Sequence, residues 1–75
     1  MYAKGDLVEI VDESILPAEY SRLFKHYKKG QRAIVVENFY GYISIQTNRK
    51  VSSILLSPNE LSAIRKIEGE RNETF

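Results

Sequence analysis

A series of five short β-type segments is the feature that most constrains how this chain folds. The segments are rich in aliphatic and β-branched residues, and residues that favour turns separate them. They are residues 7–12, 31–38, 42–47, 51–56 and 62–67. An open sheet of such short strands leaves backbone groups unpaired at its edges, whereas a closed or nearly closed barrel hides them in few residues. We therefore predict a mainly β fold, a small five-stranded barrel.

Alternation along the predicted strands indicates which side chains face the interior of this barrel. Val8 and Ile10 share one face of the first strand, and Glu9, which is costly to bury, lies on the other face. Applied to the other strands, the same pattern predicts a common centre. Its residues are Val8, Ile10, Val35, Ile45 and Ile54.

The first long connection, residues 13–30, has a helical pattern instead of a strand pattern. Its apolar residues recur at helical spacing, and they are Leu16, Tyr20, Leu23, Phe24 and Tyr27. Pro17 suits a first helical position because its missing N–H would be unpaired there, and Gly30 supplies a stop. We predict a short amphipathic helix at about residues 17–27.

Length and composition limit the chain to one small domain. With 75 residues it buries a modest core, and the absence of cysteine excludes disulfides and thiolate metal sites. We predict that residues 1–67 form the barrel and residues 68–75 a polar tail. No apolar run approaches the ~20 residues that cross a bilayer, and the start lacks the apolar stretch of a signal peptide. These features predict a cytoplasmic protein that does not bind membranes.

The net charge of +1 says little, but the charges are segregated along the chain. Residues 6–19 contain acidic residues and no Lys or Arg, and residues 20–36 contain basic residues and no Asp or Glu. This distribution predicts a polarised surface, which can steer a charged partner.

Three motifs resemble those of a known group of barrels. Residues 4–10 (Lys-Gly-Asp-x-Val-x-Ile) are similar to its first strand, and residues 56–64 are similar to the one-turn helix that enters its last strand. Residues 30–35 resemble a pattern of two glycines and an aliphatic residue, with Ala33 in place of the second glycine. The group comprises SH3-like barrels of the type seen in KOW modules and in PsaE-type electron-transport accessory subunits. The resemblance implies an SH3-like barrel, with function left to analogy.

A basic segment is the first candidate binding surface. Its cations are Arg22, Lys25, Lys28, Lys29 and Arg32. They are interleaved with aromatic residues, as in nucleic-acid surfaces that combine cations for phosphates with rings for base stacking. Alternatively, the rings share one helix face and pack on the barrel while the cations stay in water. We favour the second interpretation, because a pI near 8.0 falls short of the value above ~9 expected of a nucleic-acid domain.

An aromatic cluster is the second candidate. Phe39, Tyr40 and Tyr42 surround a turn or bulged hairpin at residues 38–41, near Arg49 and Lys50 if the hairpins pair as expected. Such a cluster suits recognition of a protein or a base, since Tyr and Arg anchor interfaces well. Alternatively, Phe39 caps the open end of the barrel and Tyr42 packs across strands. Both interpretations are compatible with the sequence.

The sequence offers little for catalysis. His26 is the only histidine, and a metal site needs three or four converging donors. The four glycines stand alone, so no phosphate-binding loop is present. A domain of this size also has little room for a pocket of ~300 Å³, the small end for ligand sites. We predict no enzyme activity, no cofactor and no bound metal.

Two functions remain. The first is a non-catalytic protein-binding module that docks on a larger protein as a regulator, inhibitor or accessory subunit. The second is an RNA- or DNA-binding module of the KOW-like kind, whose affinity would fall steeply with salt. Self-association through an unpaired edge strand is compatible with either function.

Overall fold

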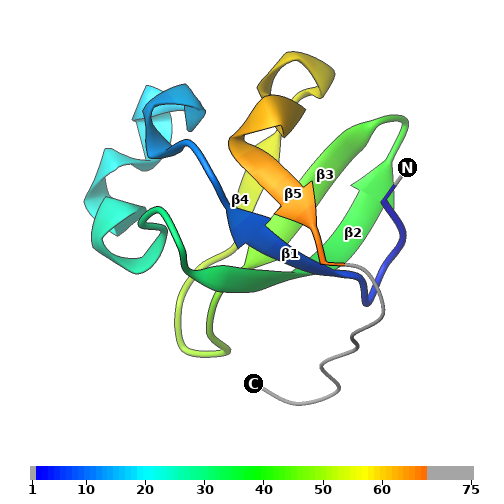
Figure 1. Ribbon diagram of the computed structural model, residues 1–75, viewed down its shortest axis with the longest axis horizontal. Helices are drawn as coiled ribbons and strands as arrows, with labels where there is room; N and C mark the ends of the chain where they lie inside the picture. Colours follow the sequence, from blue (N-terminus) through cyan, green and yellow to red (C-terminus); the bar gives the residue numbers. More distant parts are fainter. Residues whose placement is uncertain (1, 68–75) are drawn as a thin grey trace.

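Five antiparallel strands form one curled sheet (Figure 1). The structure, a computed structural model, describes residues 2–67, and the predicted tail at residues 68–75 lies outside them. The elements are β1 (Leu7–Ile10), the 3₁₀ helices η1 (Glu13–Ile15) and η2 (Ala18–His26), β2 (Arg32–Phe39), β3 (Tyr42–Gln46), β4 (Ile54–Leu56), the 3₁₀ helix η3 (Pro58–Ala63) and β5 (Ile64–Lys66). The strand order is β4-β3-β2-β1-β5. This half-barrel confirms the predicted small, mainly β, SH3-like fold.

The interior of the half-barrel is the predicted one. All five residues expected at the centre are at most 1 % exposed and belong to one hydrophobic cluster. They come from β1, β2, β3 and β4, so the cluster joins strands far apart in the sequence. Complete burial of a Val or Ile side chain contributes about 1.5–3 kcal/mol, which makes this cluster the main source of stability.

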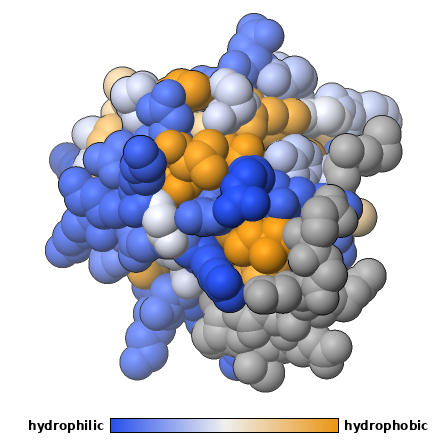
Figure 2. Space-filling view, in the orientation of Figure 1, coloured by the Kyte–Doolittle hydropathy of each residue, from blue (hydrophilic) through white to orange (hydrophobic). Residues whose placement is uncertain are grey.

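The predicted helix in the first long connection is present, although its hydrogen bonding is of the 3₁₀ type. η2 lies within the predicted range and is kinked at Tyr20, whose backbone is not helical. Long 3₁₀ runs are uncommon because their hydrogen-bond geometry is poor, and the kink divides this one into short pieces. Tyr27, which follows η2, is fully buried, and Tyr20, Leu23 and Phe24 pack on the core. Figure 1 shows η1 and η2 gathered on one side of the curled sheet. In the same orientation, Figure 2 shows a mostly hydrophilic surface with hydrophobic patches near the centre of the view.

Tyr27 anchors this connection to the sheet. Its hydroxyl donates a hydrogen bond to the carbonyl oxygen of Ser52 at 2.7 Å and lies 3.3 Å from that of Ile45. Burial raises the pKa of the Tyr27 phenol, because the anion would be poorly solvated there. The side chain therefore joins the first long connection to the segment between β3 and β4.

A β-bulge divides β2 into two halves that face different ways. Val35 pairs with Ile45 but Glu37 pairs with Ser44, so one extra residue lies in β2. Before the bulge, Val35 faces the interior. After it, Asn38 pairs with the interior-facing Ile43, and Phe39 turns outward. The proposed capping of the barrel by Phe39 is therefore wrong, because the bulge reverses the alternation that would have turned its ring inward.

The two ends of the sheet are β4 and β5, and β4 is partly covered. The backbone N–H of Leu55 donates to the hydroxyl oxygen of Tyr20 at 3.1 Å, which occupies one outward-facing donor of this edge. Capping by another element is one way in which native sheets protect an edge. Within residues 2–67, no helix combines the length and apolar character needed to span a bilayer.

Candidate functional site

Three aromatic side chains stand out from the hairpin that joins β2 and β3. Phe39 is 63 % exposed, Tyr40 87 % and Tyr42 43 %. Phe39 and Tyr42 form a cross-strand pair, and the rings of Phe39 and Tyr40 meet edge to face with centroids 4.7 Å apart. We call these three residues the aromatic tip. They are most of the large exposed hydrophobic side chains in the described part of the chain.

The turn of this hairpin holds Tyr40 in an unfavourable backbone conformation. Tyr40 has φ of 54° and Gly41 has φ of 86°, and positive φ at both central residues is the signature of a type I′ turn. Asn and Gly adopt this conformation readily, whereas a left-handed backbone costs other residues about 1–2 kcal/mol. Because Tyr40 is also largely exposed, its ring gains little from burial. Strain of this kind occurs preferentially at functional sites.

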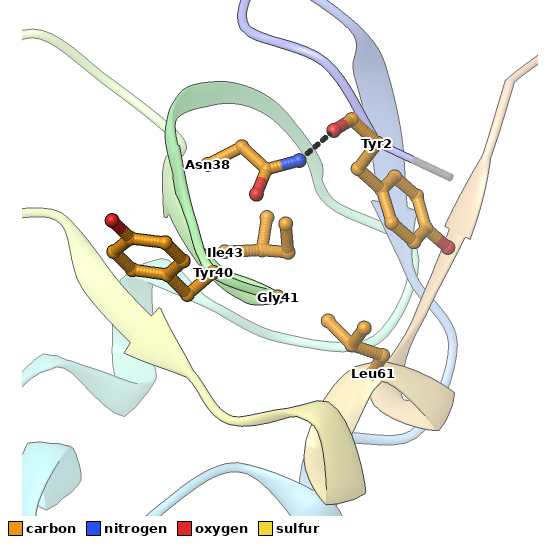
Figure 3. A pocket seen from close by; sticks show the side chains of 6 residues that line it. All are labelled: Tyr2, Asn38, Tyr40, Gly41, Ile43 and Leu61. Atoms are coloured by element: carbon orange, nitrogen blue, oxygen red, sulfur yellow. Dashed lines mark hydrogen bonds between the residues drawn. The ribbon is translucent and has the colours of Figure 1, made fainter.

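A cavity of about 340 Å³ opens beside the aromatic tip, at the mouth of the half-barrel (Figure 3). Its lining comes from the segment before β1, the hairpin and η3. The lining residues are Tyr2, Asn38, Tyr40, Gly41, Ile43 and Leu61. We call it the mouth cavity. Its size exceeds the sequence-based expectation, because Asn38 and not Phe39 faces the interior at this end of β2.

The polar groups of the mouth cavity are few and uncharged. The side-chain amide of Asn38 donates to the backbone carbonyl oxygen of Tyr2 and so ties the segment before β1 to the hairpin (Figure 3). Burial raises the pKa of the Tyr2 phenol, and the nearby positive charge of Lys66 opposes this rise. The phenol therefore stays neutral at physiological pH, and none of the six lining residues carries a charge.

A second hollow, of about 200 Å³, lies between η2, β3, β4 and η3. Its walls include Tyr20, Tyr42 and Leu55, with Glu19 and Glu60 as its charged residues. The carboxylate of Glu60 accepts a hydrogen bond from the backbone N–H of Ser57 at 2.9 Å, which makes it part of the capping box of η3. We call this hollow the outer groove.

The hairpin contributes to both hollows, and it approaches η3 closely. An added Cβ on Gly41 would lie 3.5 Å from Cγ of Pro58. Tyr40 and Gly41 border the mouth cavity, whereas Tyr42 borders the outer groove. The aromatic tip thus contributes to two hollows, with Tyr40 at the mouth cavity and Tyr42 at the outer groove.

The predicted basic residues do not join the aromatic tip. Arg22 and Lys25 are exposed on η2, and Arg32 begins β2 opposite Glu9. Lys28 forms an ion pair with Glu13 at 3.8 Å, and the backbone N–H of Lys29 donates to the same carboxylate at 2.7 Å. Neither hollow has Lys or Arg among its lining residues.

Folding places acidic residues of the first segment beside cations from other parts of the chain. Acidic residues of the first segment form ion pairs with cations from later segments, and these pairs are Asp6–Lys66 at 3.2 Å, Glu9–Arg65 and Glu13–Lys28. Hydrogen bonds from Ser14 lower the pKa of the Asp12 carboxyl, since they stabilise its charged form. The Glu13–Lys28 pair joins the acidic segment to the basic one, whereas Arg65 and Lys66 lie outside the basic segment.

Arg49 and Lys50 are also separated from the aromatic tip. They lie in the turn after β3, whereas Tyr42 is the first residue of β3. Successive turns of a meander fall at opposite ends of the strand they share, and a strand of five residues spans about 16 Å. These two cations and the aromatic tip consequently do not form one patch.

Of the six residues that line the mouth cavity, Tyr40 alone was a predicted site residue, and Tyr2, Asn38, Gly41, Ile43 and Leu61 were not. Tyr2 precedes the first strand, and Leu61 lies on η3, so no pattern within a strand points to either of them. Asn38 faces the interior only because of the bulge.

A metal centre has no support in the described part of the chain, where no group of three or more His, Asp or Glu side chains converges. His26, at the end of η2, is half-buried. Comparison of the chain with known protein families, with curated proteins and with solved structures finds no match.

Proposed function

We propose that this chain is a small non-catalytic binding module that docks on a larger protein as a regulator, inhibitor or accessory subunit. The observation that carries the proposal is the aromatic tip, in which Phe39, Tyr40 and Tyr42 are exposed together. Tyr and Phe are enriched at protein interfaces, and rigid rings bury much area at little cost in conformational entropy. Clustered exposed aromatic side chains are unfavourable in water unless a partner covers them.

The distribution of rings and cations supports a protein partner over a nucleic acid. A nucleic-acid surface needs exposed rings beside cations, so that bases stack while phosphates are neutralised. Here Tyr40 and Tyr42 border hollows whose lining residues include no Lys or Arg. Conversely, the rings nearest the exposed cations of η2 pack on the core. The chain has both exposed rings and exposed cations, but they lie on different parts of the fold.

The similarity of residues 4–10 and 56–64 to SH3-like barrels, of the type seen in KOW modules and PsaE-type accessory subunits, enters the proposal as a resemblance in architecture and does not carry the docking role. The similarity of residues 30–35 to KOW modules is the basis of the alternative, an RNA- or DNA-binding function. The exposed positions of Arg22 and Lys25 on η2 are the observation that favours this alternative. The absence of cysteine fits the cytoplasm, where we place the protein.

Affinity capture from a lysate of the source cells tests the proposal. We expect the immobilised chain to retain one protein at stoichiometric level, with or without nuclease. The double variant Phe39→Thr/Tyr40→Asn should lose it, because both exposed rings are removed while residues suited to a strand and a type I′ turn replace them. The control Arg49→Ser/Lys50→Ser removes exposed side chains from the opposite end of β3 and should retain the protein.

Two results would contradict the docking proposal. One is a captured protein that both double variants retain equally. The other is capture that nuclease abolishes, together with a mobility shift of RNA or DNA at low salt, which would favour the nucleic-acid alternative. In that case charge reversal at Lys25 should weaken the shift, while changes at the aromatic tip should leave it intact.

A further inference from the structure

We propose that the mouth cavity holds one tryptophan side chain of the partner protein, with the indole N–H bonded to the side-chain oxygen of Asn38. The inference rests on the proposed docking function and names the group that the docking surface recognises. It follows from three properties of the cavity: its size and walls, an amide acceptor whose orientation is fixed, and its lack of charge.

The size and walls suit one flat ring system. The cavity volume of about 340 Å³ lies near the lower end of the range for ligand pockets, which is about 300–1,000 Å³. Figure 3 shows the ring of Tyr2 at one side of the opening, with Ile43 and Leu61 near it, whereas the ring of Tyr40, which is 87 % exposed, turns away from the cavity. Aromatic rings pair favourably with centroids 4.5–7 Å apart, so a flat ring that enters beside Tyr2 gains a contact with it.

The orientation of the Asn38 side-chain amide is fixed by its hydrogen bond to the backbone carbonyl of Tyr2. The backbone carbonyl of Tyr2 only accepts, so the NH₂ group of Asn38 must face it and the side-chain oxygen must face the other way. In Figure 3 this oxygen turns toward Ile43, on the cavity side of the side chain. No donor from residues 2–67 reaches it in the structure. A group that enters the cavity and carries an N–H can therefore bond to it.

The neutral lining selects among possible occupants. A phosphate, a carboxylate or a guanidinium would find no opposite charge on the six lining residues. An aliphatic or phenylalanine side chain would fill the space but would offer no donor to the Asn38 oxygen. Indole satisfies both requirements, since it is flat, largely apolar and a donor only. Tryptophan is also among the residues most enriched at the energetic centres of interfaces.

Titration with N-acetyltryptophanamide, followed by amide chemical shifts, tests this directly on the whole chain. We expect saturable shifts at Gly41, Ile43 and the Asn38 side-chain amide, with dissociation constants in the millimolar range. The 1-methylindole analogue, which lacks the N–H, should bind about fivefold more weakly, as the loss of one neutral hydrogen bond implies. In Asn38→Leu the two compounds should bind alike.

If Asn38→Leu unfolds because it loses the hydrogen bond to Tyr2, a second pair of variants tests the cavity instead. Leu61→Phe enlarges a side chain that lines the mouth cavity and should abolish binding. Leu55→Phe makes the same change on β4, where Leu55 borders the outer groove, and should leave binding unchanged.

The proposal is overturned if N-acetylleucinamide or adenosine binds the cavity as tightly as N-acetyltryptophanamide. It is also overturned if the 1-methylindole analogue binds the unaltered chain as tightly as N-acetyltryptophanamide, or if N-acetyltryptophanamide causes no chemical-shift changes up to about 20 mM. Failure here is distinct from failure of docking. A captured protein that is lost with the aromatic-tip variant but retained by Leu61→Phe would uphold the docking function and refute the tryptophan pocket.

Discussion

Replacing Tyr40 by Asn should stabilise the fold while removing part of the binding surface. Its φ of 54° at the first central position of a type I′ turn is unfavourable for Tyr but ordinary for Asn, and the next residue, Gly41, completes an Asn-Gly pair. Relief of the left-handed backbone contributes about 1 kcal/mol. Loss of the edge-to-face contact with Phe39 costs about 0.5 kcal/mol, the low end of the range for aromatic pairs, because both rings are largely exposed. The expected net gain is about 0.5 kcal/mol.

Tyr40→Ala provides the matched comparison. It removes the same ring but keeps the cost of the left-handed backbone, so it should destabilise the chain by about 0.5 kcal/mol. The two variants should therefore differ by about 1 kcal/mol, which corresponds to about 4–8 °C in melting temperature for a domain of this size. Urea denaturation monitored by circular dichroism measures the difference directly, provided that the slopes agree. If Tyr40→Ala were as stable as Tyr40→Asn, or more so, the argument from turn strain would be refuted.

Three further outcomes follow from buried or bonded groups. Tyr27→Phe should lower the free energy of unfolding by about 1–2 kcal/mol in urea denaturation, because the carbonyl of Ser52 loses its donor, and an unchanged midpoint would contradict this. The free energy of unfolding of the unaltered chain should fall as pH rises above 10. The reason is that the phenols of Tyr2 and Tyr27 ionise near 10.0 in the unfolded chain, whereas their raised pKa keeps them protonated in the folded chain. In thermal melts at a series of pH values, Tyr27→Phe should show a shallower fall. Tyr20→Phe should cost about 0.5–1 kcal/mol and speed exchange of the Leu55 amide hydrogen, and protection equal to that of the unaltered chain would show that the Tyr20 hydroxyl does not cover this edge.

The interior of the fold was predictable because the strands largely keep the expected alternation. In β3 and β4 the buried residues recur at every second position, as Ile43 and Ile45 illustrate. In β1 Val8 and Ile10 keep this spacing, although Leu7 is buried as well. The helix in the first connection was predictable for a similar reason, since Leu23 and Tyr27 lie four positions apart and both approach the core. Periodicity is a property of the sequence itself, so it needs no knowledge of tertiary contacts.

The candidate site depends on departures from periodicity, which the sequence does not mark. Nothing in Val35, Val36 and Glu37 distinguishes a bulged strand from a regular one, yet the bulge decides whether Phe39 or Asn38 faces inward. The residues at 38–41 did predict a turn, but Tyr40 is not a residue that signals a left-handed backbone. Phe39, Tyr40 and Tyr42 therefore lie together as the sequence indicated, while the cavity beside them was not foreseen.

These two irregularities together explain why the mouth of the half-barrel is open. On a regular strand, Phe39 would face the interior at this end of β2, and its burial there would contribute about 1.5–3 kcal/mol. The bulge places Asn38 there instead, and the turn adds the cost of a left-handed Tyr40. A domain of 75 residues has little stability to spare, so two unfavourable features on one hairpin call for a compensating gain. Under the proposed docking function, a partner that covers Phe39 and Tyr40 and fills the cavity would supply that gain on binding, because it would bury the side chains that the free chain leaves exposed.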